Sequence, residues 1–140
     1  MRKILVFGAF DGIHPGHLNF FKQARKYGDF LIVSIGTDKN VKKIKGQNPL
    51  FNQDERLELI KNCKLVDQTV IGSESNYFDH IKYLAPDVIC LGYDQWATRK
   101  YVVEELKKVG LVNTLVVRLD PYKIKKAKSS IMKVKSVDLT

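Results

Sequence analysis

The stretch KILVFGAFDGIHPGH, residues 3–17, decides how the chain folds. It begins with an apolar run, KILVFGA, which has the length and composition of a strand buried on both faces. Glycine, aspartate and proline follow, and these residues interrupt regular structure. Apolar residues at helical spacing then predict a helix over residues 17–27. The stretch therefore predicts a strand, a turn and a helix, with two of the three histidines of the chain at the turn.

Apolar strands and amphipathic helices continue to follow one another along the rest of the chain. Further strands are expected at residues 29–36, 66–72, 87–92 and 114–119, and further helices at residues 52–63, 77–84 and 97–110, with a lysine-rich loop over residues 37–51. Strands that are apolar on both faces and alternate with helices form parallel sheets that are covered on both sides. We therefore expect a single Rossmann-like α/β domain over residues 1–140, with three layers (α/β/α) around a five-stranded, mostly parallel sheet. Ligands of such sheets bind beyond the carboxyl ends of the strands.

The composition argues against several classes of protein. No apolar run approaches the roughly 20 residues of a membrane-spanning helix, and we expect no signal peptide, because MRKILVFGAFDG lacks a cleavage site of small residues. Cys63 and Cys90 have neither the spacing of metal ligands nor that of a disulfide framework, so free thiols in the cytoplasm are expected. The net charge of +9 indicates an anionic partner. Nucleic acid is disfavoured, because the lysine-rich segments 39–46 and 122–135 lack interleaved stacking aromatics.

His14 and His17 lie on either side of a Pro-Gly pair at the expected start of the first helix. The unpaired N–H groups and the positive dipole at a helix start attract phosphate, but that field contributes only about 0.3–2 kcal/mol per charge. Two histidines that point at the same space add donors, while Gly16 permits close approach and Pro15 stiffens the turn. The pattern predicts a site for a nucleotide polyphosphate. The alternative is a pair of turn histidines, one that caps the helix and one that is solvated.

GAFDGIHPGH, residues 8–17, resembles the G-x-F-D-x-x-H-x-G-H signature of the cytidylyltransferase-like nucleotidyltransferases. VKKIKGQNPLFNQDERLELI, residues 41–60, resembles the lysine loop and the following E-x-R helix of that family. CLGYDQ, residues 90–95, resembles its second nucleotide-side motif, a strand that ends in Gly-x-Asp. The resemblance extends over residues 1–100, and more weakly to residue 131.

The resemblance implies transfer of a nucleoside monophosphate from a nucleoside triphosphate to a phosphate or a phosphorylated alcohol, with release of pyrophosphate. It implies that His14 and His17 are catalytic and hydrogen-bond the phosphates. The residues it places at the nucleotide are Ala9, Phe10, His14, Pro15, Gly16, His17, Asp94, Tyr122, Ser129 and Ser130. Those it places at the acceptor are Asp11, Lys43, Lys45 and Arg56. Magnesium is implied as the cofactor, held by phosphate oxygens and waters rather than by a set of protein ligands.

Some of these residues also have an ordinary structural interpretation. Lys43 and Lys45 suit a solvated loop. Arg56 suits a surface salt bridge to Asp54 or Glu55, which lie on the same helix.

The same holds for residues near the later strands. Asp94 suits a turn after its strand, and His80 suits the surface of a helix. Trp96 suits either a shield over a bound base or flavin, or a cap on the core.

The C-terminal part of the chain departs from the pattern of the family. Many members end with R-T-x-G-I-S-T, which grips the triphosphate, whereas this chain has YKIKKAKSSIMK at residues 122–133. Ser129 and Ser130 suit the start of a final helix, and Lys126 or Lys128 replaces the arginine as a point charge without its bidentate fork. VKKIKG, LGYDQ and the Ser-Ser pair together resemble FAD synthases of the archaeal type.

That closer resemblance implies ATP and FMN as substrates and FAD and pyrophosphate as products. One alternative is a CTP-dependent enzyme that acts on glycerol-3-phosphate or a similar phosphorylated alcohol. A third, of another class, is a nucleotide-binding or RNA-binding module without catalysis. The habit of the family favours a homodimer.

Overall fold

The computed structural model describes residues 1–122 of the chain. In chain order these residues form β1 (Lys3–Gly8), α1 (Pro15–Arg25), β2 (Phe30–Ile35), α2 (Asp38–Lys45), α3 (Gln53–Lys61), β3 (Gln68–Ile71), α4 (Tyr77–Leu84), β4 (Val88–Leu91), α5 (Arg99–Lys108) and β5 (Leu115–Arg118). The strands and helices expected from the apolar runs are all present, and their ends differ from the expected ends by a few residues.

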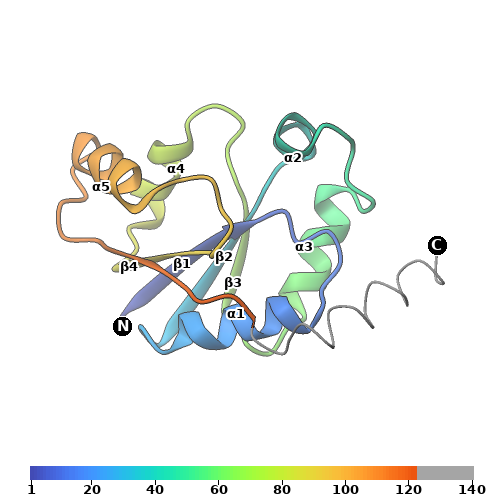
Figure 1. The fold of residues 1–140 in the computed structure, drawn as a ribbon, viewed down its shortest axis with the longest axis horizontal. Coiled ribbons are helices and arrows are strands. Elements are labelled where there is room, and N and C mark those ends of the chain that lie inside the picture. The colour runs from blue at the N-terminus through green and yellow to red at the C-terminus, as the bar shows by residue number, and fades with distance from the viewer. Residues whose placement is uncertain (123–140) are drawn as a thin grey trace.

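The five strands form one sheet in the order β3-β2-β1-β4-β5, and every neighbouring pair is parallel (Figure 1). The chain therefore winds from β1 outward to β3, and then crosses back to place β4 and β5 on the other side of β1. β1 and β4 mark the point at which the connections leave in opposite directions. In sheets of this kind a ligand crevice lies beyond the carboxyl ends of these two strands. The predicted α/β fold is confirmed.

Alternate side chains of the strands enter two cores, because successive residues of a strand point to opposite faces of the sheet. One core lies beneath α1 and α3 and includes Ile4, Val6, Phe21 and Ile60. The other lies beneath α4 and α5 and includes Leu5, Phe7, Ile81 and Leu106. Figure 1 shows these two helical layers on opposite sides of the sheet. The cores leave the carboxyl edge of the sheet open between the layers.

One element was wrong in the prediction: the lysine-rich segment after β2 is largely the helix α2 rather than a loop. The Thr37 hydroxyl accepts a hydrogen bond from the backbone N–H of Asn40 and so caps its start, and Gly46 ends it at a φ of 82°. A positive φ of this kind is cheap only for glycine. Val41 is the one buried residue of α2, so the segment has no apolar stripe from which a helix could be predicted.

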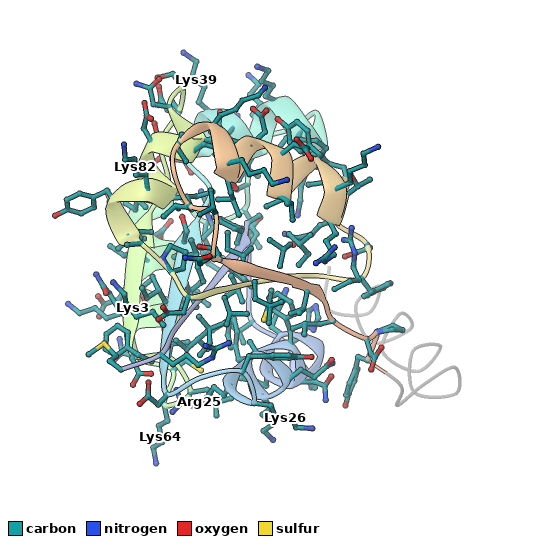
Figure 2. The ribbon with its side chains drawn as sticks, turned by 90° about the vertical axis from the view of Figure 1, so that its left-hand side faces the viewer. Lys3, Arg25, Lys26, Lys39, Lys64 and Lys82 are labelled. Carbon is teal, nitrogen blue, oxygen red and sulfur yellow. The ribbon has the colours of Figure 1, made fainter. Side chains whose placement is uncertain are left out.

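The basic side chains of the described residues lie on many elements. Figure 2 labels six of them, which run from Lys39 at the top of the view past Lys82 and Lys3 to Arg25, Lys26 and Lys64 at the bottom. Among residues 1–122, no helix is long and apolar enough to cross a bilayer.

Candidate active site

A cleft of about 940 Å³ opens at the carboxyl ends of β1 and β4, within the usual size range of small-molecule sites. The predicted site residues that line it are Ala9, Phe10, Asp11, His14, Gly16, His17, Lys45, Asp94 and Tyr122. These residues come from four separate parts of the chain: the β1–α1 turn with the start of α1, the end of α2, the loop after β4 and the segment after β5. The fold thus brings together most of the residues that the resemblance placed at the nucleotide, whereas Pro15, which it also placed there, does not line the cleft.

The turn after β1 is shaped by the packing of one aromatic ring. Phe10 has a φ of 50° and is 5% exposed, with its ring against Phe21 and His17. A Cβ added at Gly8 would lie 2.7 Å from that ring, so β1 must end in glycine for the turn to close. The ring of Phe10 therefore anchors the turn in the core, and the turn backbone is left to face the cleft.

His14 and His17 form a stacked pair at the start of α1. Their ring centroids are 3.8 Å apart and the ring planes differ by 23°. His14 caps the helix, because its Nδ1 accepts a hydrogen bond of 3.0 Å from the backbone N–H of Gly16. His17 Nδ1 accepts one of 3.2 Å from the backbone N–H of His14. In a neutral imidazole one nitrogen accepts and the other carries the hydrogen, so both rings are held as Nε2–H donors.

The cleft keeps His17 uncharged. Burial lowers its pKa from 6.5 to about 4, and the positive fields of His14 and Lys45 act in the same direction, while Asp94 opposes them. At neutral pH the ring is therefore a neutral hydrogen-bond donor with one fixed tautomer. Such donors, aimed at the place where charge develops, stabilise the transition state of a group transfer.

Gly16 makes room for the histidine pair. A Cβ at this position would lie 2.7 Å from His14 Cε1 and 3.0 Å from its Nδ1. Any other residue would push the capping ring out of its place. The glycine of the His-Pro-Gly-His run thus has a steric reason in addition to the access it gives to a phosphate.

Asp11 lines the cleft, and its carboxylate also ties two loops together. Its two oxygens accept hydrogen bonds from the backbone N–H groups of Leu50 and Phe51, at 2.5 and 2.8 Å. These bonds hold the α2–α3 loop against the β1–α1 turn. Lys45, at the end of α2, lines the cleft, whereas Lys43 is exposed and does not line it.

Arg56 is fully buried, although its position on a polar helix predicted a surface residue. Its guanidinium donates hydrogen bonds to the carbonyls of Phe51 and Ala9 and forms an ion pair of 2.8 Å with Asp38. It does not line the cleft, and its partner carboxylate is on α2, not on its own helix. The structure therefore places Arg56 behind the site, where it supports the Ala9 backbone, rather than at the acceptor side that the resemblance implied.

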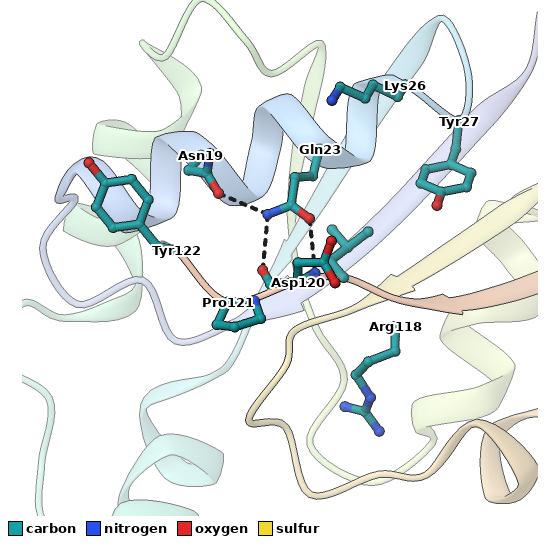
Figure 3. A pocket seen from close by; sticks show the side chains of 9 residues that line it. Asn19, Gln23, Lys26, Tyr27, Arg118, Asp120, Pro121 and Tyr122 are labelled. Atoms are coloured by element: carbon teal, nitrogen blue, oxygen red, sulfur yellow. Dashed lines mark hydrogen bonds between the residues drawn. The ribbon is translucent and has the colours of Figure 1, made fainter. Parts of the chain in front are cut away.

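The segment after β5 is fastened to α1 by a side-chain amide (Figure 3). Gln23 donates from Nε2 to the Asp120 carbonyl at 3.0 Å and to Asn19 Oδ1 at 2.8 Å, and its Oε1 accepts from the Asp120 N–H at 2.9 Å. A second hollow of about 400 Å³ lies beside this amide. The clamp brings Tyr122 to the edge of the main cleft. Ser129 and Ser130, like Lys126 and Lys128, lie outside the described residues.

Two residues with open interpretations are now placed. Trp96 is 72% exposed and its ring lies 5.5 Å from that of Tyr101, so it does not cap the core. His80 is half-buried rather than a surface residue, because its Nε2 lies 3.2 Å from Ser34 Oγ, and burial lowers its pKa. Both cysteines are free.

Sequence reasoning missed the residues that hold the loops around the cleft in place. Gln95 and Arg118 bond to the backbone of the loop after β4, and Gln23 bonds to the segment after β5. Of these, only Gln95 lay in a quoted motif. Their partners are main-chain groups, which leave no pattern in a sequence.

The cleft combines a parallel-sheet switch point, a helix start and two stacked imidazoles whose Nδ1 atoms accept backbone hydrogen bonds, and the matches to known proteins agree with it. The chain belongs to the cytidylyltransferase-like family of nucleotidyltransferases, whose model matches residues 5–135. This confirms the family that the motifs predicted.

Among curated proteins, the chain is 42% identical to the FAD synthase of Pyrococcus horikoshii over 133 residues, which cover 94% of this chain and 88% of that protein. It is 40% identical to the FAD synthase of Ferroglobus placidus over 111 residues, 79% of this chain and 72% of that protein. A crystal structure of a lipopolysaccharide core biosynthesis protein from Thermoplasma volcanium is 32% identical, with a TM-score of 0.83, and the match covers 88% of this chain and 99% of that one.

Proposed function

We propose that this protein is an FAD synthase, which transfers AMP from ATP to FMN and releases pyrophosphate. The observation that carries the proposal is the stacked His14–His17 pair, held as Nε2–H donors in the cleft of a chain that is 42% identical to an FAD synthase. The specific substrates rest on the relatives, and the reaction class rests on the cleft as well.

The proposed reaction needs no activated side-chain nucleophile. An oxygen of the FMN phosphate, already ionised at neutral pH, attacks the α-phosphorus of ATP. The bond from the α-phosphorus to the oxygen bridging to the β-phosphorus breaks, and pyrophosphate leaves with that electron pair. Catalysis of this kind is mostly alignment and stabilisation of charge, which is what two fixed imidazole donors at a helix start provide.

The other cleft residues take roles that follow from their positions. Lys45 lines the cleft, and its positive charge acts on His17, so we assign it to a phosphate of either substrate. Asp94, which lines the cleft from the loop after β4, binds the ribose or base region of the nucleotide. Asp11 acts through the α2–α3 loop, whose backbone it holds, and lies beside the acceptor.

A divalent cation, with Mg²⁺ favoured, fits this cleft as a partner of the substrate. Residues 1–122 contain no group of three or more His, Cys, Asp or Glu side chains that could hold a metal ion. Mg²⁺ commonly keeps several waters and binds through substrate phosphates with one or two carboxylates, and Asp11, Asp94 and Asp120 supply carboxylates to the lining of the cleft. When bound, the ion neutralises charge on the triphosphate. A homodimer and a cytoplasmic location remain predictions.

The proposal is tested by incubating the protein with Mg²⁺ and pairs of nucleotide and acceptor. We expect FAD to form from ATP and FMN, as measured by chromatography. Pyrophosphate is expected to be released in an amount equal to the FAD formed. Activity with CTP and glycerol-3-phosphate alone would show a cytidylyltransferase instead. Pyrophosphate release with none of the pairs would show a binding module without catalysis.

A further inference from the structure

β1 and β4 separate before they reach the cleft. Their paired residues are Ile4 with Val88 and Leu5 with Ile89, although both strands continue beyond these pairs. The two strands splay here because β1 and β4 flank the switch point of the sheet. Beyond the last pair, the backbone groups at the carboxyl ends of these strands need other partners.

The carboxamide of Gln95 occupies this gap. Its Oε1 accepts a hydrogen bond of 2.7 Å from the backbone N–H of Gly92, directly after β4, and its Nε2 donates one of 2.9 Å to the carbonyl of Phe7 in β1. One side chain thus replaces the missing rung between the two strands. The distance between the strand ends, and hence the width of the cleft at its floor, depends on the length of this amide.

Arg118, the last residue of β5, holds the same loop from the far side. Its Nη1 donates to the carbonyls of Gly92 and Gln95 at 2.6 and 3.1 Å, and its Nη2 donates to the carbonyl of Ala97 at 2.6 Å. Figure 3 shows this guanidinium within the bend of the loop between β4 and α5. Residues 92–97, which we name the cleft loop, contain neither helix nor strand, so these bonds and those of Gln95 fix its backbone.

We infer that Gln95 and Arg118 are positioning residues, which hold the cleft loop at a set distance from the histidine pair. The inference rests on the proposed function only for the identity of the nucleotide. The cleft loop carries Tyr93 and Asp94, two exposed side chains that line the same cleft as His14 and His17. A ligand that contacts both the cleft loop and the histidine pair is bound well only if the loop is ordered in advance. Ordering a residue at binding costs about 1–2 kcal/mol.

The test measures binding of Mg·ATP, without FMN, by isothermal titration calorimetry. Gln95→Leu removes both amide bonds with little change in size, and Arg118→Met removes all three guanidinium bonds. Each is expected to raise the dissociation constant about tenfold, and Arg118→Lys is expected to recover part of the loss because it can still donate to one or two carbonyls. In the double variant the dissociation constant is expected to rise by less than the product of the two single-variant factors, because both residues hold one loop.

Arg25→Met is the matched control. Arg25 also donates to a backbone carbonyl, that of Leu65, and pairs with Asp67, but it does not line the cleft. Thermal unfolding of all variants shows that each is folded, and Gln95→Glu serves if Gln95→Leu does not fold. Glutamate still accepts from Gly92 but cannot donate to Phe7 while it is ionised, so it is expected to weaken Mg·ATP binding several-fold.

The inference is overturned if folded Gln95 and Arg118 variants bind Mg·ATP within twofold of the unchanged protein, or if Arg25→Met weakens binding as much as they do. The outcome is independent of the acceptor. If no FAD forms but the variants lose Mg·ATP affinity as expected, the proposed function fails and the positioning role stands. If FAD forms, the KM for ATP is expected to rise with the dissociation constant while kcat changes less than threefold.

Discussion

Replacing Arg56 with methionine separates a structural role for this residue from a role at the acceptor. Methionine keeps most of the length of the side chain but removes the bonds to the Ala9 and Phe51 carbonyls and the ion pair with Asp38. A hydrogen bond from a charged donor contributes about 1.5–3 kcal/mol, and loss of one partner of a buried ion pair costs about 3–5 kcal/mol. The side chain of Asp38 is 41% exposed, so water can take over there, and most of the loss comes from the two carbonyls.

We therefore expect Arg56→Met to lower the free energy of unfolding by about 3–4 kcal/mol. In a domain of this size that corresponds to a fall in melting temperature of roughly 10 °C. Urea unfolding followed by circular dichroism measures the first quantity, and a thermal scan the second. The free energy of unfolding of Arg56→Lys is expected to lie between those of the unchanged protein and Arg56→Met, because a lysine cannot reach three acceptors at once. An unchanged urea midpoint together with a raised KM for FMN would refute the structural role and restore the acceptor contact that the sequence predicted.

The remaining predictions concern the histidine pair. His14→Ala or His17→Ala is expected to lower kcat by roughly 100- to 1000-fold, the scale for losing one transition-state donor, and an effect on KM alone would count against the assigned role. Gly16→Ala is expected to lower kcat at least tenfold, since its Cβ would meet the His14 ring, and a kcat assay checks this directly. In ¹H–¹⁵N spectra His17 is expected to remain an Nε2–H tautomer from pH 8 down to pH 5, since its pKa is about 4. The unfolded chain takes up this proton near pH 6.5 and the folded one near pH 4, so the contribution of His17 to stability, measured by urea unfolding, is expected to fall as pH drops through that window.

The sequence predicted the elements that depend on hydrophobic burial. Each strand is a run of apolar residues and most helices carry an apolar stripe, so their positions follow from the pattern alone. The pattern did not predict α2, because Val41 is the one buried residue of that helix. That helix is fixed by the caps at Thr37 and Gly46 and by the loop that Asp11 holds, which are tertiary and backbone features.

The candidate site could be predicted where its residues are neighbours in the chain. His14, Gly16 and His17 act together within one turn, so their spacing carries the information. The buried position of Arg56 could not be predicted in this way, because its partners Ala9 and Asp38 are 47 and 18 positions away in the sequence. Its burial depends on how the turn after β1 meets α2 and α3, and nothing in the helix that carries it indicates that contact.

The fixed protons on the two imidazoles also bear on how a turnover ends. Hydrogen bonds from charged donors to phosphate are roughly twice as strong as those from neutral ones, and the Nδ1 atoms of His14 and His17 are already engaged by backbone N–H groups. The ring of His17, which is uncharged at neutral pH because its pKa is about 4, therefore holds a departing pyrophosphate less firmly than an arginine would. Escape of the product, a step that often limits enzymes of this kind, is eased by the same arrangement that steadies the transition state.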